Sequence, residues 1–344
     1  MKAVVKLKRG RGNIALMDVE KPVCGERDVL IRVKAVGVCG TDYHIYTDEY
    51  DTCPPMIVGH EFSGEVVEVG KEVKNIKIGE RVVCEVSVNT CGVCRYCKTG
   101  NYQICPSKKA PGTHIDGAYA EFIKMPPHLV HKIPDNVTFE EAAVVEPSAI
   151  VAHSLLERTK IEPEDFVVVM GPGPIGLLAA QMARIYGARA VMIVGTDIDK
   201  KLRLPLANKL KADYVVNASE TDVVQKVLEM TNGMGADLVV ECSGAAPAIN
   251  TGIELLRKHG RMCVIGIPGP EKIQINWKKA VLKAINVIFN FSSSSLSWDL
   301  VLSMLNRNVL DVKSLISHKE PLENWETVFK EIEKGNVIKA VLIP

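Results

Sequence analysis

The feature that most constrains the fold is a glycine-rich turn, Gly171 to Gly176, between two apolar segments. The run before it, Phe166 to Met170, is typical of a buried strand, and the run after it, Leu177 to Ala183, is typical of a helix. In a strand–turn–helix of the form G-x-G-x-x-G, the first glycine permits the tight turn. The second lets a pyrophosphate approach the backbone, and the third lets the helix pack closely. A glycine turn alone can also join elements that bind nothing, but both flanks here predict a dinucleotide site, formed by Gly171, Gly173, Pro174, Ile175 and Gly176.

Strand and helix patterns alternate from residue 151 to residue 291. The expected strands are 166–170, 190–194, 214–216, 238–242, 262–266 and 286–291. Helical patterns lie between them, for example at 223–230 and 248–256. Such alternation predicts an α/β domain with a doubly wound parallel sheet, the Rossmann arrangement of a cofactor domain.

The first 150 residues show a different pattern. Short alternating segments at 29–36, 62–70 and 81–86 are separated by turn residues, which predicts a small, irregular barrel of short strands. The tail, 292–344, is expected to carry two helices and a final strand and to return to the first domain. We therefore expect domains at 1–150 and 151–291, with the remaining residues completing the first.

Four cysteines lie close together at 91–105, in the order Cys91, Cys94, Cys97 and Cys105. Short spacings of this kind let one loop surround a tetrahedral Zn²⁺ with four thiolates. A shell of four protein ligands leaves no open position, so this zinc is predicted to be structural. Four reduced thiols and an iron–sulfur cluster are the alternatives. The flexible, polar neighbours disfavour buried thiols, and the spacings differ from ferredoxin runs.

Composition excludes several classes of function. The net charge is +1 and no run of Lys or Arg occurs, which argues against nucleic-acid binding. No apolar run reaches the roughly 18 residues of a membrane span, and the N-terminus lacks the apolar core of a signal peptide. We therefore expect a cytoplasmic protein with no membrane partner, whose ten cysteines serve metal binding rather than disulfides.

Three further residues from separate segments suit a catalytic zinc, which takes about three protein ligands and leaves one position open. They are Cys39, His60 and Glu146. Each alone is more often a core or surface residue. With the motifs Cys39-Gly-Thr-Asp, Gly59-His60-Glu61 and Gly79-Glu-Arg-Val, the cysteine cluster and the glycine turn, the chain resembles the zinc-dependent medium-chain alcohol dehydrogenases over nearly its whole length.

Within that family the chain is most similar to the polyol (sorbitol/iditol-type) and threonine dehydrogenase branch, through Cys39-Gly-Thr-Asp-Tyr-His44 and Glu146-Pro147. The resemblance implies a GroES-like catalytic barrel and a Rossmann cofactor domain. It also implies two zinc ions per subunit, with Cys39, His60 and Glu146 as ligands of the catalytic one. Glu61 is implied as an alternate or orienting ligand.

The same resemblance implies a mechanism. Zinc acts as a Lewis acid that lowers the pKa of the substrate hydroxyl, and hydride passes to the nicotinamide. Thr41 accepts the hydroxyl proton and passes it through the nicotinamide ribose to His44, whose ordinary pKa near ~6.5 suits a relay. The simpler interpretations are a helix N-cap for Thr41 and a solvated loop residue for His44.

The choice of cofactor depends on the end of the second strand, where an acid about 20 residues past the glycines reads the adenosine ribose. Gly195 stands nineteen residues after Gly176, and Asp197 follows it. On Asp197 we expect NAD⁺, with NADP⁺ as the alternative because Lys200, Lys201 and Arg203 follow. Thr196, Asp197 and Gly266 are predicted to contact the cofactor.

The substrate is expected to be a small-molecule alcohol: a polyol, cyclic polyol or sugar-derived alcohol. L-Threonine and vicinal diols are the alternatives. Asn290 stands where the polyol branch often carries a substrate-binding arginine, so sorbitol itself is in doubt. A cofactor-binding protein without turnover is the alternative of another class. Relatives form dimers or tetramers, so a homodimer or homotetramer is expected, with the segment 287–291 as a candidate edge strand.

Overall fold

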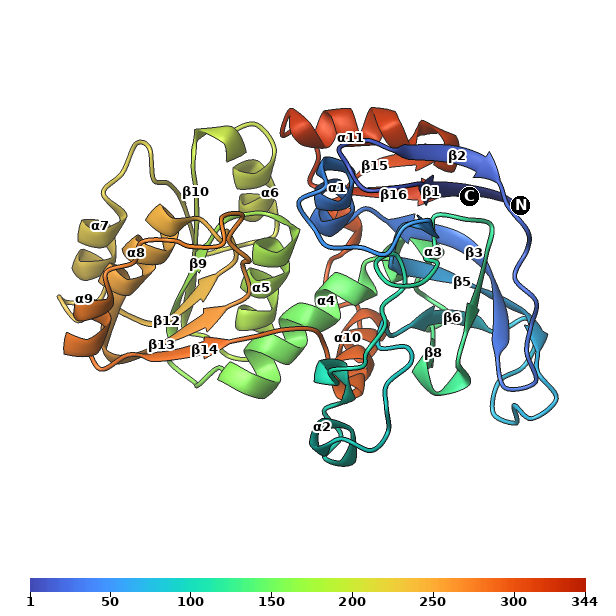
Figure 1. Ribbon diagram of the computed structural model, residues 1–344. Coiled ribbons are helices and arrows are strands. Elements are labelled where there is room, and N and C mark those ends of the chain that lie inside the picture. Colours follow the sequence, from blue (N-terminus) through green and yellow to red (C-terminus); the bar gives the residue numbers. More distant parts are fainter. The chain divides into compact units, whose positions relative to one another are not determined.

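The computed structural model describes residues 1–344, which form two compact units. The first unit comprises Met1–Pro147, Ser294–Arg307 and Ile316–Pro344. The second comprises Ser148–Ser293 and Asn308–Leu315. Figure 1 labels the elements of both units.

The second unit is built on a six-stranded parallel sheet of order β11-β10-β9-β12-β13-β14. This is the doubly wound order 3-2-1-4-5-6. The strands are β9 (Phe166–Met170), β10 (Ala190–Gly195), β11 (Tyr214–Asn217), β12 (Ala236–Glu241), β13 (Leu256–Val264) and β14 (Asn286–Phe289). The predicted Rossmann sheet is therefore confirmed.

Helices cover both faces of this sheet. On one face lie α5 (Pro174–Ile185) and α6 (Arg203–Lys209), and on the other α7 (Val223–Met230), α8 (Ala246–Leu255) and α9 (Trp277–Leu282) (Figure 1). The central strands β9 and β10 are buried along their whole length, which explains why their sequences are continuous apolar runs rather than alternating ones.

The first unit is a barrel-like arrangement of two sheets, as expected for a GroES-like domain. A small sheet has the order β2-β1-β4, and a larger one has the order β15-β16-β3-β5-β6-β8, with β7 also paired to β3. The bounds are β1 (Lys2–Lys6), β2 (Ile14–Asp18), β3 (Val29–Gly37), β4 (Met56–Ile57), β5 (Glu61–Val69), β6 (Arg81–Cys84), β7 (Phe122–Met125), β8 (Val130–Lys132), β15 (Ile316–Pro321) and β16 (Lys339–Ile343). Its helices include α1 (Gly40–Thr47), α2 (Arg95–Lys98), α3 (Phe139–Ala142), α10 (Ser295–Asn306) and α11 (Trp325–Glu333).

Most of the C-terminal tail belongs to the first unit. Its strand β16 pairs with β3, and Phe329 of α11 is buried with its ring centroid 5.6 Å from that of Tyr46 in α1. The segment Asn308–Leu315 differs from the prediction, because it lies in the second unit. The side chain of Gln181 there donates to the carbonyl of Asp311 at 3.1 Å and accepts from its N–H at 2.9 Å.

A buried polar network joins three parts of the first unit. The carboxylate of Glu85 accepts from the hydroxyl of Tyr102 at 2.7 Å and lies 2.9 Å from Nε2 of His131. The other ring nitrogen of His131 lies 3.0 Å from Asp299, and its ring stacks on Trp298. The network thus ties β8, the cysteine-rich loop and α10 together.

This network predicts a pH-dependent contribution to stability. Burial alone lowers the pKa of His131, but hydrogen bonds to Glu85 and Asp299 outweigh it and raise the pKa above its usual value. Because folding raises the pKa of His131, its protonated ring stabilises the folded protein. This stabilisation is fully present at pH values below the unfolded-state pKa of ~6.5, and it is lost as pH rises through the higher folded-state pKa. We expect the free energy of unfolding to fall by about 1.5 kcal/mol over that range, the lower end for hydrogen bonds to charged groups.

Urea unfolding at a series of pH values checks this expectation. The His131→Gln variant keeps the polar contacts but cannot titrate, so its stability should lack this fall. Parallel curves for the two proteins above pH ~6.5 would show that His131 does not carry the effect.

Candidate metal and cofactor sites

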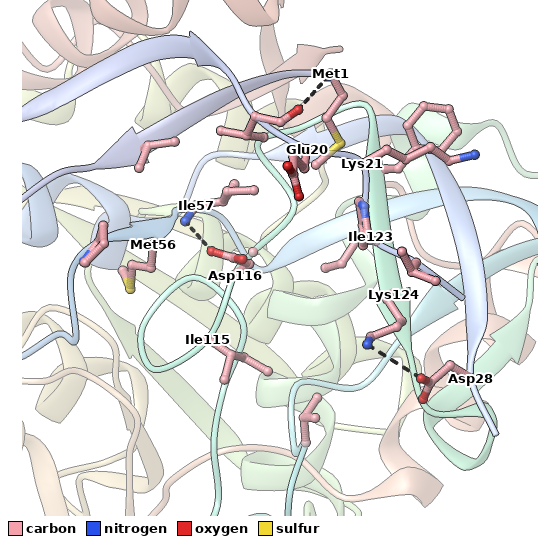
Figure 2. A pocket seen from close by; sticks show the side chains of 18 of the residues that line it. Met1, Glu20, Lys21, Asp28, Met56, Ile57, Ile115, Asp116, Ile123 and Lys124 are labelled. Atoms are coloured by element: carbon pink, nitrogen blue, oxygen red, sulfur yellow. Dashed lines mark hydrogen bonds and ion pairs between the residues drawn. The ribbon is translucent and has the colours of Figure 1, made fainter. Parts of the chain in front are cut away.

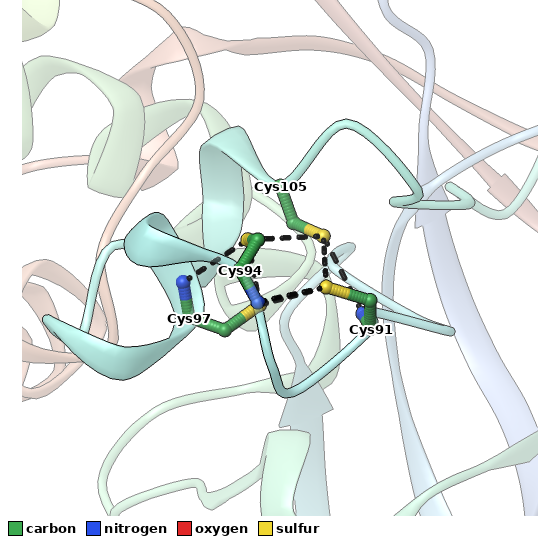
Figure 3. Close-up of side chains that lie close together, drawn as sticks. All are labelled: Cys91, Cys94, Cys97 and Cys105. Atoms are coloured by element: carbon green, nitrogen blue, oxygen red, sulfur yellow. Dashed lines mark hydrogen bonds between the residues drawn. The ribbon is translucent and has the colours of Figure 1, made fainter.

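The four cysteines of the loop converge on one point (Figure 3). Their sulfur–sulfur distances are 3.5 Å for Cys94–Cys97, 3.6 Å for Cys91–Cys105, and 3.9 Å for both Cys91–Cys97 and Cys94–Cys105. A tetrahedral zinc with Zn–S bonds of about 2.3 Å sets its sulfurs about 3.8 Å apart. No cysteine forms a disulfide. The four thiols therefore fit a tetrahedral metal ion.

Backbone N–H groups prepare this loop for anionic sulfur. The N–H of Cys94 points to the sulfur of Cys91 at 3.3 Å, and that of Cys91 points to the sulfur of Cys105 at 3.4 Å. Hydrogen bonds from the backbone N–H groups of Cys94 and Val93 lower the pKa of the Cys91 thiol to about 6, and the N–H of Cys91 lowers the pKa of the Cys105 thiol. Burial and the neighbouring thiols raise that of Cys97 to about 12. A cation is what would allow all four to ionise together.

A second group of donors lies in the same unit. Cys39 is the N-cap of α1, Glu61 is the first residue of β5, and His60 directly precedes it. One donor atom from each of the three lies within 4.8 Å of the others. Glu61 is fully buried, and its Oε1 has no hydrogen-bond partner. A thiol, an imidazole and an unsatisfied buried carboxylate oxygen fit a zinc ion with three protein ligands.

Two residues near this group were missed by sequence reasoning. Lys339 of β16 is buried, forms an ion pair with Glu61 and donates to the carbonyl of Val38 at 3.0 Å. Burial alone lowers the pKa of Lys339, but Glu61 outweighs it and raises the pKa, so the ammonium is kept charged. Asp42 is also buried, with its Oδ1 3.5 Å from Nδ1 of His60. Asp42 belongs to the quoted motif, but Lys339 has no local pattern that marks it.

The glycine turn in the second unit has the features expected of a phosphate site. Gly171 has φ +100°, which favours glycine, and a Cβ at Gly176 would lie 1.9 Å from the carbonyl oxygen of Gly171. Gly176 therefore permits the close packing of α5 on the turn. A Cβ at Gly173 would meet no protein atom within 4 Å, so the space beside it is open. Pro174 and Ile175 form the first turn of α5.

The end of β10 has no room for an acid at Gly195. A Cβ there would lie 2.8 Å from Pro172 and 2.9 Å from Asp199. Thr196 is exposed and its N–H donates to Asp199 at 3.0 Å, whereas Asp197 is exposed and accepts from Asn217 at 2.7 Å. Asp197 is therefore the carboxylate presented at this strand end.

A third loop of the same sheet edge is organised by Glu241, which was not predicted. Glu241 is fully buried at the end of β12, and its carboxylate accepts from the N–H and hydroxyl of Ser243 at 2.8 and 2.5 Å. The predicted residue Gly266 lies beside this loop, because its N–H donates to the Glu241 carbonyl at 3.0 Å. A Cβ at Gly266 would lie 2.3 Å from the Gly244 nitrogen.

Comparison with known proteins agrees with this geometry. An alcohol dehydrogenase GroES-like domain matches residues 25–135, and a zinc-binding dehydrogenase domain matches residues 174–307. A sorbitol dehydrogenase of Halalkalibacterium halodurans is 40% identical over 344 residues, covering 100% of this chain and 99% of that protein. The chain belongs to the zinc-dependent medium-chain alcohol dehydrogenase family.

Two other members of the family are similar over their whole length. A D-arabitol-phosphate dehydrogenase of Enterococcus avium is 36% identical to this dehydrogenase. The match covers 99% of this chain and 97% of the Enterococcus avium protein. The crystal structure of a zinc-binding dehydrogenase from Sinorhizobium meliloti 1021, bound to NADP, has a TM-score of 0.92 and 29% identity, with 100% and 99% of the two chains covered. This dehydrogenase thus uses zinc and a nicotinamide dinucleotide, as the sequence predicted.

The remaining predicted residues of the dehydrogenase lie as follows. Thr41 is half-buried, with its hydroxyl 3.6 Å from the sulfur of Cys39. His44 is exposed, and its Nδ1 lies 2.7 Å from Glu49. Glu146 lies outside the three-donor group but is buried near it, and burial raises its pKa to about 7 against the opposing charge of His60.

Asn290, which stands where the polyol branch often carries a substrate-binding arginine, forms hydrogen bonds inside the second unit. Its amide donates to the Val264 carbonyl at 3.1 Å and to the Ile288 carbonyl at 3.0 Å, and its oxygen accepts from Arg158 at 2.9 Å. Its hydrogen-bonding groups thus hold the end of β14 against β13 and Arg158.

A cavity of about 970 Å³ lies elsewhere in the first unit (Figure 2). It is lined mainly by apolar side chains such as Met56 and Ile115, and Asp116 there accepts from the N–H of Ile57 at 2.9 Å. None of the three metal donors lines it. We therefore do not assign it to the substrate.

None of the helices in the chain has the length and apolar character that crossing a bilayer demands.

Proposed function

We propose that the protein oxidises a secondary alcohol of a polyol, cyclic polyol or sugar-derived substrate with NAD(P)⁺. The observation that carries the proposal is that Cys39 and His60 lie together with the carboxylate of Glu61, while Glu146 is buried near them. A zinc ion held by the cysteine, the histidine and one carboxylate keeps one position for a hydroxyl. The similarity to a sorbitol dehydrogenase and an arabitol-phosphate dehydrogenase supports a polyhydroxylated substrate. In this proposal the first unit is catalytic and the second binds the cofactor.

Cys39, His60 and Glu146 are proposed as the ligands of the catalytic zinc, with Glu61 as the alternate carboxylate. Glu61 already shares a buried ion pair with Lys339, so its charge is partly compensated. Bound zinc supplies a Lewis acid that lowers the pKa of the substrate hydroxyl, and bound NAD(P)⁺ supplies the hydride acceptor. The four-cysteine loop holds the second, structural zinc.

Thr41 and His44 are proposed to remove the hydroxyl proton. The Thr41 hydroxyl lies beside the ligand Cys39, where it can accept a hydrogen bond from the substrate. His44 follows one turn later on α1, and its exposed ring can release the proton to solvent.

A substrate panel tests the proposed function. Sugar alcohols, their phosphates, cyclic polyols, a vicinal diol and L-threonine are each supplied with NAD⁺ and with NADP⁺, and reduced nicotinamide is followed by absorbance. We expect the highest kcat/KM with a polyol or its phosphate. A preference for L-threonine or a simple diol would replace the substrate class, and no reduction with any alcohol would support a binding protein without turnover.

NAD⁺ is the proposed cofactor. Asp197 is the carboxylate presented at the end of β10, where it can accept from the ribose hydroxyls and repel a 2′-phosphate. Two of the cations that could attract that phosphate are already paired, Lys200 with Glu220 and Arg203 with Asp199. This pairing weakens the case for NADP⁺.

The Asp197→Ser variant is expected to lose most of this preference. Removing the carboxylate removes both the ribose hydrogen bond and the repulsion, so the ratio of kcat/KM for NAD⁺ over NADP⁺ should fall at least about tenfold, which is 1.4 kcal/mol. Initial rates with both cofactors measure it. Glu229→Gln removes an exposed carboxylate of α7 that accepts from Gln225 in the same helix, and it should leave the ratio within about twofold. A wild-type preference for NADP⁺ would contradict the proposal.

A homodimer is proposed, formed through the edge strand β14. The strand lies at the end of the sheet, and five large apolar side chains of this region are more than half exposed: Trp277, Val281, Leu282, Phe289 and Phe291. An open edge with exposed apolar side chains suits pairing with a second copy.

The ten free cysteines, four of them gathered as metal ligands, suit a reducing compartment such as the cytoplasm.

The Phe289→Asp variant is expected to shift the protein toward monomers. Phe289 is 69% exposed, so a charge there costs little in the isolated chain but is buried on pairing. Light scattering after gel filtration should give a mass near the 37.6 kDa of one chain for the variant and a multiple of it for the wild type. Val23→Asp, at an 82% exposed position of the first unit, is the matched control. A monomeric wild type would refute the interface.

A further inference from the structure

A buried hydrogen-bond chain leads from the metal-donor group to Tyr119. Asp42 is fully buried, and its Oδ2 accepts from the N–H of Cys39 at 2.9 Å and from the hydroxyl of Tyr119 at 2.9 Å. Its Oδ1 has no hydrogen-bond partner and lies 3.5 Å from Nδ1 of His60, which has none either. The two unsatisfied atoms face each other at the metal ligand.

Tyr119 is held rigidly at the other end of this chain. The side chain is fully buried, its N–H donates to the carbonyl of Val58 at 2.9 Å, and its carbonyl accepts from Val4 at 2.8 Å. The ring packs against Gly59, where a Cβ would lie 2.0 Å from the ring. Gly59 directly precedes His60, so the backbone of the ligand and the ring of Tyr119 fit against each other.

We propose that Tyr119 is a positioning residue of the catalytic zinc site, whose hydroxyl holds the Asp42 carboxylate so that it orients His60. The inference rests on the proposed function of this site. Two donors occupy Oδ2 and leave Oδ1 to accept the Nδ1 proton of His60. That contact sets the tautomer of the imidazole and leaves Nε2 as the nitrogen that binds the metal.

The chemistry of Tyr119 supports a donor role. Burial and the neighbouring Asp42 raise the pKa of its phenol well above the usual value, so the hydroxyl stays protonated. A phenylalanine fills the same space but has no donor, and Asp42 would then keep only the Cys39 N–H on Oδ2. The carboxylate could rotate away from His60 without any change in packing.

The Tyr119→Phe variant of the full-length zinc enzyme tests the proposal. We measure release of zinc to a chromogenic chelator, the visible spectrum after cobalt substitution, kcat, and the pH profile of kcat/KM. We expect release from the catalytic site to be about 10–100-fold faster, as for other residues that orient a metal ligand. The cobalt spectrum and the pH profile should shift. The zinc of the four-cysteine loop is the internal reference and should leave at the wild-type rate.

Tyr102→Phe is the matched control. It removes the same type of hydrogen bond, from a tyrosine to the buried carboxylate of Glu85 in the same unit. We expect Tyr102→Phe to lose about as much stability as Tyr119→Phe but to release zinc from the catalytic site at the wild-type rate. In an Asp42→Asn background, which also provides a second variant if Tyr119→Phe folds poorly, removal of the Tyr119 hydroxyl should have little further effect.

Two results would overturn the inference. One is Tyr119→Phe with wild-type zinc release and cobalt spectrum, and the other is full additivity of the two substitutions. Failure of the proposed function looks different, because the wild-type protein would then bind no second zinc or oxidise no alcohol. If the wild-type enzyme binds a second zinc and oxidises an alcohol, a Tyr119→Phe variant with unaltered properties contradicts only the proposed role of Tyr119.

Discussion

Replacing Cys39 with serine is expected to remove one of the two zinc ions per chain and to lower turnover roughly 1,000-fold. The substitution exchanges a thiolate ligand for a neutral hydroxyl, and the loss of several kcal/mol of Lewis-acid stabilisation corresponds to that factor. Serine is itself a favoured N-cap, so α1 keeps its first residue and the fold should persist. Zinc content by mass spectrometry, kcat and the melting temperature are measured after dialysis against a chelator.

Two other cysteines serve as comparisons for Cys39→Ser. Cys97→Ser should also remove one zinc, but from the loop that holds no open ligand position, and should mainly lower the melting temperature. Cys53→Ser changes an exposed thiol outside both groups and should behave as wild type. A Cys39→Ser enzyme that keeps full activity after dialysis would disprove the zinc mechanism.

Local patterns in the sequence predict much of the fold and the metal groups. The apolar runs 166–170 and 190–194 correspond to strands β9 and β10, because strands covered on both faces have no polar side to interrupt them. The four cysteines of the loop are close in sequence, so their spacing alone predicts one metal ion. Cys39 and His60 come from separate segments, so they could be grouped with Glu146 only through the chemistry of a catalytic zinc beside a dinucleotide fold, and Glu61 only through the family resemblance.

The surroundings of the metal donors could not be predicted in this way. Lys339 reaches Glu61 because β16, from the end of the chain, pairs with β3. Tyr119 reaches Asp42 because its segment hydrogen-bonds to Val58, next to the turn before His60. Such contacts depend on the tertiary fold and leave no periodic or spaced pattern. The sequence therefore predicts candidate metal ligands but not the residues that contact them in the fold.

Replacing Gly173 with alanine is expected to weaken cofactor binding at least about 100-fold without destabilising the protein. Gly173 has φ −66° and ψ 179°, which alanine adopts readily, and its Cβ would meet no protein atom within 4 Å. The same methyl group would occupy the space that a pyrophosphate needs beside the start of α5. Loss of two charge-assisted hydrogen bonds, roughly 3 kcal/mol, accounts for the expected change in the dissociation constant.

Gly176→Ala separates this effect from a packing defect. Its Cβ would lie 1.9 Å from the carbonyl oxygen of Gly171, so the turn must move and the melting temperature should fall along with cofactor affinity. Calorimetric titration with NAD⁺ and thermal unfolding without cofactor are measured for both variants. If Gly173→Ala bound NAD⁺ as tightly as wild type, the pyrophosphate could not lie over this turn. A Cβ at Gly173 contacts no protein atom, so a loss of NAD⁺ binding confined to Gly173→Ala cannot be explained by a change in protein packing.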